Sequence, residues 1–200
     1  MADWIDKAEI MIPDWDAHGI LPPRRPGQSQ DTQDRSPYKT SLAEVVRRFA
    51  GTRQRRHILL GLLQYRQALH QHGIASGFQW IDGSFTENVE VHEDRSPNDV
   101  DVVTFFNIPP GETQQGLLAR VGGLFEQEFV RKTYRVDAYL HPLGVPLNER
   151  RVRQISYWYS MWSHRRDGRW KGFVQLPLAE NDEYATMSLL QENIREGGAE

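Results

Sequence analysis

The apolar positions of the chain follow two periods that alternate along its central part. Over residues 53–72 they recur every three or four positions, as expected for one face of a helix: Ile58, Leu62, Tyr65 and Leu69. Thr52 is suited to cap this helix and Gly73 to end it. A shorter helix is predicted just before it, because Ser41 and Glu44 have the S-x-x-E spacing of a capping box.

Strand-like runs separate the remaining helical patterns. Strands are predicted over residues 78–81, 99–106, 134–140 and 172–178, and helices over 113–128 and 147–162. A polar loop joins the first two strands. Because helices and strands alternate, the predicted fold class is α/β or α+β.

The two ends of the chain have a different composition. Residues 1–40 hold five prolines and the polar stretch GQSQDTQDRS, so they have little apolar area to offset their ordering entropy. We expect an extended arm, held by Trp4, Ile12, Trp15, Ile20 and Leu21, and a partly disordered tail is the alternative. The predicted division is therefore an arm (1–40), one domain (41–180) and an acidic C-terminal helix or tail (181–200).

Composition narrows the class of protein. The 200-residue chain has no cysteine, which excludes disulfides, thiolate–zinc sites, iron–sulfur clusters and a cysteine nucleophile. It has no apolar run near the roughly 20 residues of a membrane span, and it begins with acidic rather than signal-peptide residues. We expect a cytoplasmic protein without membrane contact. A net charge of −3 argues against coating nucleic acid by bulk charge.

The chemistry is concentrated in two strands. Asp99 and Asp101 are two residues apart, so both carboxylates project from the same face of a strand. Adjacent carboxylates repel each other unless a cation neutralises them, and a hard divalent ion does so well. Asp137 lies in a second strand-like run, YRVDAYL. If the two strands are neighbours, the three carboxylates form the ligand set of a two-metal site for phosphoryl transfer. The alternative is that these aspartates are solvated strand ends.

A glycine–serine turn precedes these carboxylates. Gly83 lets the backbone approach a ligand closely, and backbone N–H groups with the Ser84 hydroxyl can hold the phosphates of a nucleotide. Ser84 has no identifiable histidine partner for a hydrolase triad, and the chain lacks a P-loop motif.

This ordered set resembles the nucleotidyltransferase superfamily typified by DNA polymerase beta. The matching residues are Gly83-Ser84, then Asp99-Val100-Asp101-Val102, then Asp137. The resemblance implies a mixed sheet flanked by helices, with Asp99 and Asp101 binding Mg²⁺ or Mn²⁺. It also implies that Asp137 helps to hold the catalytic ion and activates the acceptor hydroxyl.

A second, narrower resemblance involves the opening of the chain. The run IPDWDAHGILPP, followed by a helix pair and DGSF, is similar to a group of small bacterial proteins with this core. Some members of the wider superfamily belong to toxin–antitoxin or phage-defence modules. A protein partner encoded by a neighbouring gene is therefore one open hypothesis.

The segment 150–171 adds basic and aromatic residues. Its cations are Arg150, Arg151, Arg153, Arg165, Arg166, Arg169 and Lys171. For most of them we favour a solvated helix face over a groove for phosphate or nucleic acid. Lys171 is the exception, because it precedes a strand after a turn, and a cation there could bind the phosphates.

The resulting prediction is a magnesium-dependent enzyme that transfers a nucleoside monophosphate from an NTP to an acceptor hydroxyl and releases pyrophosphate. Gly83, Ser84 and Lys171 would bind the nucleotide, and Asp99, Asp101 and Asp137 the metal. The acceptor stays open between a protein, an RNA and another nucleotide. The alternatives are a nucleotide-binding or partner-binding regulatory module without turnover, and a metal-dependent nuclease.

Overall fold

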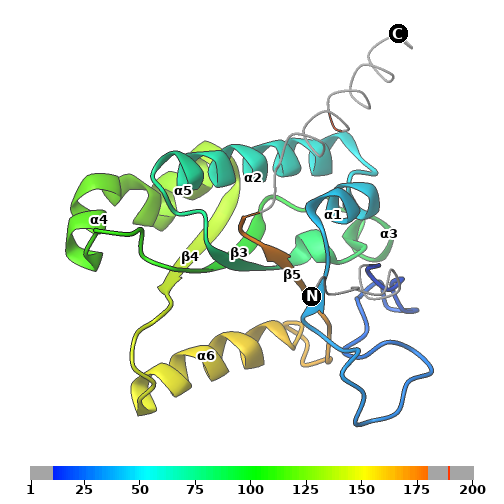
Figure 1. Ribbon diagram of the computed structural model, residues 1–200. Coiled ribbons are helices and arrows are strands. Elements are labelled where there is room, and N and C mark those ends of the chain that lie inside the picture. Colours follow the sequence, from blue (N-terminus) through cyan, green and yellow to red (C-terminus); the bar gives the residue numbers. More distant parts are fainter. Residues whose placement is uncertain (1–10, 180–188, 190–200) are drawn as a thin grey trace, which may run out of the picture.

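A five-stranded mixed sheet forms the centre of the computed structural model, which describes residues 11–179 and Leu189 (Figure 1). Its strands, in spatial order, are β1 (Tyr38–Lys39), β5 (Val174–Pro177), β2 (Gly77–Asp82), β3 (Val100–Phe106) and β4 (Val136–Pro142). The strand β2 runs antiparallel to both of its neighbours, whereas β3 and β4 are parallel, as are β1 and β5. The predicted α+β class is confirmed.

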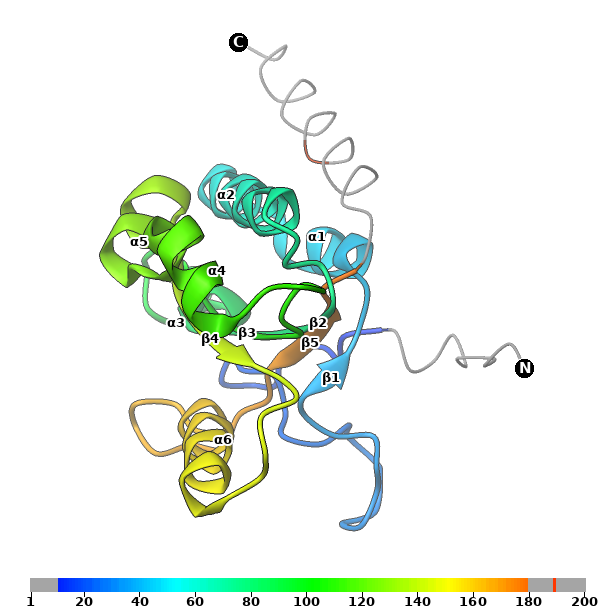
Figure 2. The ribbon, with the colours of Figure 1, turned by 60° about the vertical axis from the view of Figure 1, so that its left-hand side comes forward.

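Helices cover both faces of this sheet. One face carries α1 (Leu42–Phe49), α2 (Arg53–Gln71), α4 (Gln114–Val121) and α5 (Gln127–Tyr134), and the other carries α6 (Glu149–Trp162) (Figures 1 and 2). The loop between β2 and β3 contains a 3₁₀ turn (Ser84–Thr86) and the short helix α3 (Val89–His92). None of the described residues forms a helix that is long and apolar enough to cross a membrane.

The predicted caps of the first two helices are confirmed. The Ser41 side chain accepts a hydrogen bond from the backbone N–H of Glu44, and Thr52 accepts one from Arg55. Each bond satisfies a donor that the first turn of a helix leaves free.

Two apolar clusters hold the layers together. The larger one lies between the sheet and the helices α1, α2, α4 and α5. The smaller one is mainly aromatic and lies between the sheet and α6; it comprises Trp80, Val103, Phe105, Trp158, Trp162 and Phe173. Successive side chains of β3 point to opposite faces of the sheet. Val100, Val102 and Phe106 enter the larger cluster, whereas Val103 and Phe105 enter the smaller one.

The single helix predicted over residues 113–128 is wrong. The chain instead forms α4, a 3₁₀ turn (Gly122–Phe125) and α5, which extends to Tyr134. Two consecutive glycines, Gly122 and Gly123, lie at the break, and glycine is a poor helix former. Because Tyr134 is the last residue of α5, the third predicted strand begins later than expected, at Val136.

The N-terminal arm packs against the domain from residue 11 onward. Ile12, Ile20 and Leu21 are buried, and the Trp15 indole N–H donates to the carbonyl oxygen of Thr86 over 2.7 Å. This part of the arm is therefore a packed segment and not a free tail. The predicted anchor Trp4 and the predicted C-terminal helix after Asp182 lie outside the described residues.

Candidate functional site

Three aspartates form a row across neighbouring strands. Asp82 pairs with Asp101 in the antiparallel register of β2 and β3, and Asp101 pairs with Asp137 in the parallel register of β3 and β4. Register partners on one sheet face have Cβ atoms about 5 Å apart. The flanking residues Val100 and Val102 enter the larger core, so the row lies on the opposite face, the one that α6 covers. The predicted proximity of Asp101 and Asp137 therefore has its basis in the sheet register.

The predicted glycine–serine turn lies directly against this row. Gly83 has a φ of +87°, and a Cβ atom added to it would lie 2.7 Å from Oδ2 of Asp101. Only glycine fits both the conformation and the space. Thr86 holds the turn closed, because its hydroxyl lies 3.1 Å from Oδ1 of Asp82 and 3.0 Å from the carbonyl oxygen of Gly83.

The electrostatics of the row show that its charges repel each other. Burial raises the pKa of Asp101 to about 7, with further contributions from Asp82, Asp137 and Asp99. Burial and the charge of Asp137 raise the pKa of Asp99, against the opposing effect of Arg131 and Arg166. Within residues 11–179, neither Asp99, Asp101 nor Asp137 has an ion-pair partner. The three predicted carboxylates are thus close enough to interact and lack a neutralising cation in direct contact.

The Asp137 carboxylate is oriented by two neutral groups that the sequence analysis did not single out. The side-chain amide of Gln127, at the start of α5, donates to Oδ1 of Asp137 and also lies 2.6 Å from the Tyr139 hydroxyl. The Tyr139 hydroxyl lies 3.4 Å from Oδ2 of Asp137. Tyr139 was detectable from the sequence, because it follows Asp137 by two positions on the same strand. Gln127 was not, since its approach depends on how α5 packs.

Lys171 lies next to the Gly83 turn, where it pairs with two carboxylates. Its buried ammonium lies 3.0 Å from Oδ1 of Asp82 and 2.8 Å from Oε1 of Glu87. Burial disfavours the charged ammonium, but these two carboxylates outweigh that cost and raise the pKa of Lys171. Asp82 and Glu87 stand before and after the turn, so the two ion pairs join the ends of the segment that contains Gly83. A contact of Lys171 with a phosphate stays a prediction.

Asp82 is the fourth acid of the site and was missed from the sequence. Burial raises its pKa to about 6, although Lys171 opposes this shift. The sequence pattern that could have identified Asp82 is its position two residues after Trp80 on the same strand. This spacing places both side chains on the α6 face. Asp82 links the row of aspartates to the buried lysine.

The site fits a divalent cation in donor chemistry and in charge. As the side chains stand, the described residues include no group of three or more acids, histidines or cysteines arranged to hold a metal ion. The acids nevertheless supply the oxygen donors that Mg²⁺ and Mn²⁺ prefer. Their mutual repulsion and lack of ion pairs leave a charge for a cation to neutralise. The residues that would hold it are Asp99, Asp101 and Asp137.

The chain matches a known protein family. No curated protein and no solved structure matches the chain. The model of a family of unknown function, DUF6932, matches residues 13–177, which span both the arm from Pro13 and the sheet through β5. The arm and the candidate site therefore fall within one matched unit, and the chain belongs to the DUF6932 family.

Proposed function

We propose that this protein is a metal-dependent nucleotidyltransferase that moves a nucleoside monophosphate from an NTP to an acceptor hydroxyl. The observation that carries the proposal is the position of Asp101. This carboxylate lies in register with Asp137, two residues after Asp99 and against the Gly83 turn, with no ion-pair partner among the described residues. Gly83, Asp101 and Asp137 are among the residues on which the resemblance rests, and they lie beside one another.

The turn at Gly83 would bind the phosphates of the NTP. The positive φ of Gly83 opens its backbone to close approach, and Ser84 begins the 3₁₀ turn beside it. The Ser84 hydroxyl can donate a hydrogen bond to a phosphate oxygen. A bound divalent cation would neutralise the carboxylates and stabilise charge on the transferred and leaving oxygens.

The transfer balances as a single displacement at phosphorus. The acceptor oxygen forms a bond to the α-phosphorus, and the bond from that phosphorus to the oxygen bridging to the β-phosphorus breaks. Pyrophosphate leaves with the bonding electron pair. The proton of the acceptor hydroxyl passes to a carboxylate oxygen of Asp137, which Gln127 and Tyr139 hold in orientation.

The test is a transfer assay on the full chain. The protein is incubated with each α-labelled NTP, Mg²⁺ or Mn²⁺, and RNA, nucleotide or protein acceptors, and labelled product and pyrophosphate are measured. We expect Asp99→Asn and Asp101→Asn to reduce transfer to background while the protein stays folded. Asp14→Asn is the matched control, because the Asp14 side chain is fully exposed.

Two results would contradict the proposal. One is wild-type turnover by either Asp99→Asn or Asp101→Asn. The other is nucleotide or partner binding without turnover under any of these conditions, which would favour the regulatory module on the same fold.

A further inference from the structure

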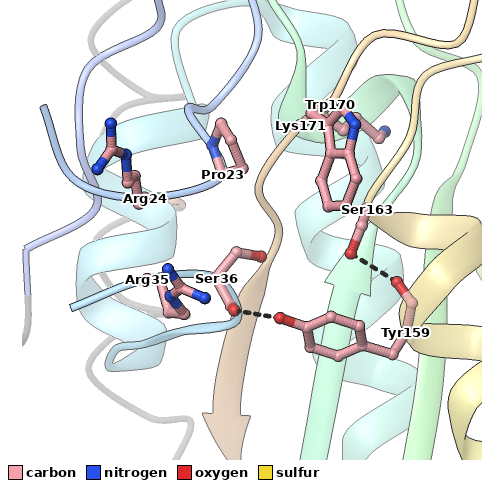
Figure 3. Close-up of a pocket in the computed structure, with 8 residues that line it drawn as sticks. All are labelled: Pro23, Arg24, Arg35, Ser36, Tyr159, Ser163, Trp170 and Lys171. Atoms are coloured by element: carbon pink, nitrogen blue, oxygen red, sulfur yellow. Dashed lines mark hydrogen bonds between the residues drawn. The ribbon is translucent and has the colours of Figure 1, made fainter. Parts of the chain in front are cut away.

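The two sides of α6 face different parts of the molecule. The Tyr159 hydroxyl donates to the carbonyl oxygen of Ser36 over 3.0 Å, so one side of the helix faces the N-terminal arm (Figure 3). The Trp158 ring packs against Tyr139 of the edge strand β4, with 4.2 Å between the ring centroids. Successive residues of a helix are about 100° apart, so Tyr157 and Tyr159 flank Trp158 on opposite sides. Tyr157 is therefore on the side of α6 away from the arm, at the β4 edge of the sheet.

This β4 side of α6 carries exposed apolar side chains. Tyr157 is 58% exposed, and Met161, four positions later on the same stripe, is 41% exposed. The Tyr157 ring contacts the Trp158 ring with 5.3 Å between centroids, and the Tyr139 hydroxyl lies 3.4 Å from Oδ2 of Asp137. A row of aromatic rings thus runs from the candidate site to an exposed ring, which offers a nucleobase a stacking surface.

The helix α5 brings a cation to the candidate site. The Gln127 side chain donates to the Asp137 carboxylate, and Arg131 follows Gln127 by four positions, so both side chains project from the same face of α5. The end of α5 is tied to the start of β3, because the backbone N–H of Val100 donates to the carbonyl oxygen of Arg135 over 3.1 Å. Arg131 therefore lies near the point where β3 begins, on the face of α5 that reaches the candidate site.

The loop after α6 brings a second cation, from the opposite face of the sheet. Nε of Arg165 lies 3.3 Å from Oε2 of Glu87, so this loop is held against the loop between β2 and β3. The next residue, Arg166, is exposed. Burial raises the pKa of Asp99, and the charges of Arg131 and Arg166 oppose this rise, so both guanidinium groups lie near the Asp99 carboxylate. The candidate site thus has an arginine on each side.

The cations around this surface are not neutralised by the acids of the same helices. Three exposed arginines have no ion-pair partner among the described residues: Arg131, Arg150 and Arg166. The acids within α5 and α6 already pair with a lysine or an arginine of their own helix. Arg150 and Tyr157 are seven positions apart, hence on one stripe of α6, and about 10 Å apart along its axis. A ligand that contacts both is extended and carries negative charge.

We propose that a single-stranded polynucleotide binds along this surface and that its terminal hydroxyl is the acceptor. Its phosphates contact Arg131, Arg150 and Arg166, and one of its bases stacks on Tyr157. Because the row of rings leads to Asp137, the proposed proton acceptor, a strand bound here reaches the reacting groups. This inference rests on the proposed function, since it names the acceptor class of that reaction, but strand binding is measurable without turnover.

The test is fluorescence anisotropy on the full chain, without NTP, using labelled oligouridylate, oligothymidylate and a duplex of the same length. We expect the strands to bind at least about tenfold more tightly than the duplex, whose bases are stacked on each other and leave no face for Tyr157. Tyr157→Ala should weaken strand binding at least about fivefold, because it removes the stacking surface. The double variant Arg131→Gln/Arg166→Gln should weaken it at least about tenfold and reduce its dependence on salt.

Two matched controls separate this surface from general effects. Phe129→Ala removes an exposed ring on the side of α5 away from Gln127, since residues two positions apart project about 200° apart. Arg24→Gln removes an arginine of the arm that also has no ion-pair partner among the described residues. Both should bind the strand as the wild type does. Wild-type affinity in Tyr157→Ala, equal affinity for strand and duplex, or an equal loss in Arg24→Gln would overturn the proposal.

The same titrations distinguish the two kinds of strand and the two proposals. Tighter binding of oligouridylate assigns the surface to RNA, and tighter binding of oligothymidylate assigns it to DNA. Asp101→Asn should keep strand binding while transfer is lost. If transfer to a nucleotide or a protein occurs and the strands bind no better than the duplex, this inference fails and the proposed function stands. If the strands bind as expected and no acceptor is labelled, the proposed function fails and the surface remains a strand-binding site.

Discussion

The backbone of Gly83 lies so close to the carboxylate of Asp101 that a Cβ atom at position 83 would be 2.7 Å from Oδ2 and 2.9 Å from Cγ. We therefore expect Gly83→Ala to destabilise the protein by about 1–3 kcal/mol, because it adds a clash to a φ of +87° that side chains rarely adopt. Denaturant unfolding measures this change.

A second glycine isolates the contribution of that contact. Gly168 has a φ of +84°, yet a Cβ atom there would meet nothing within 4 Å. Gly168→Ala should therefore show the conformational cost alone, and Gly83→Ala should cost more. Equal destabilisation by the two substitutions would show that the Asp101 contact is unimportant for stability.

The pKa of Asp101 predicts how stability depends on pH. Burial raises this pKa from 3.8 to about 7 in the folded state, so the folded chain binds this proton more tightly than the unfolded chain. Stability from this group is complete at low pH and is lost as pH rises through about 4 to 7. Asp101→Asn removes the titration and should stabilise the metal-free protein by roughly 4 kcal/mol at pH 8, with little effect at pH 4. Unfolding experiments across this range measure the difference.

The control for this pH dependence is Asp14→Asn, which alters a fully exposed carboxylate whose ion pair with Arg48 is 3.9 Å long. An ion pair to so exposed a carboxylate contributes under about 1 kcal/mol. It should change stability little at either pH. A stability gain for Asp101→Asn that is the same at pH 4 and pH 8 would contradict the assignment of the pH dependence to Asp101.

Divalent cations should stabilise the wild-type protein and not the aspartate variants. An ion that binds only the folded state at 100 times its Kd adds about 2.7 kcal/mol to the free energy of unfolding. We expect Mg²⁺ or Mn²⁺ to raise the Tm of the wild type and of Asp14→Asn at pH 8. An equal rise in Asp99→Asn and Asp101→Asn would place the ion elsewhere.

Local sequence patterns were sufficient for much of the fold. The caps at Ser41 and Thr52 were readable because each depends on residues within one helical turn. The break between α4 and α5 was missed because the helical apolar spacing was weighted above the two glycines inside it. The strand β1 has only two residues, so its pairing with β5 leaves no periodic signal.

The site was predictable where it depends on strand parity and not where it depends on distant packing. The parity of β3 places Asp101 on the α6 face, and the register of β3 with β4 brings Asp137 beside it, whereas Asp99 lies just before the strand begins at Val100. The contacts of Lys171 could not be read from the chain, because they need β5 beside β2 and a folded loop that carries Glu87. The packing of the arm could not be predicted for the same reason, because the hydrogen bond from Trp15 to Thr86 joins residues 71 positions apart.

The buried group formed by Lys171, Asp82 and Glu87 gives the last prediction. Lys171→Met leaves the buried Asp82 carboxylate without its cation, whereas Glu87 keeps its ion pair with Arg165; breaking such a buried pair from one side typically costs about 3–5 kcal/mol. Adding Asp82→Asn to the same chain should restore most of the lost stability, because the unpaired buried charge is then removed. The control is Lys132→Met, which breaks an exposed pair with Glu128 and should cost under about 1 kcal/mol. If Lys171→Met costs no more than Lys132→Met, the lysine does not support the Gly83 turn, and the charge on Asp82 must be balanced in another way.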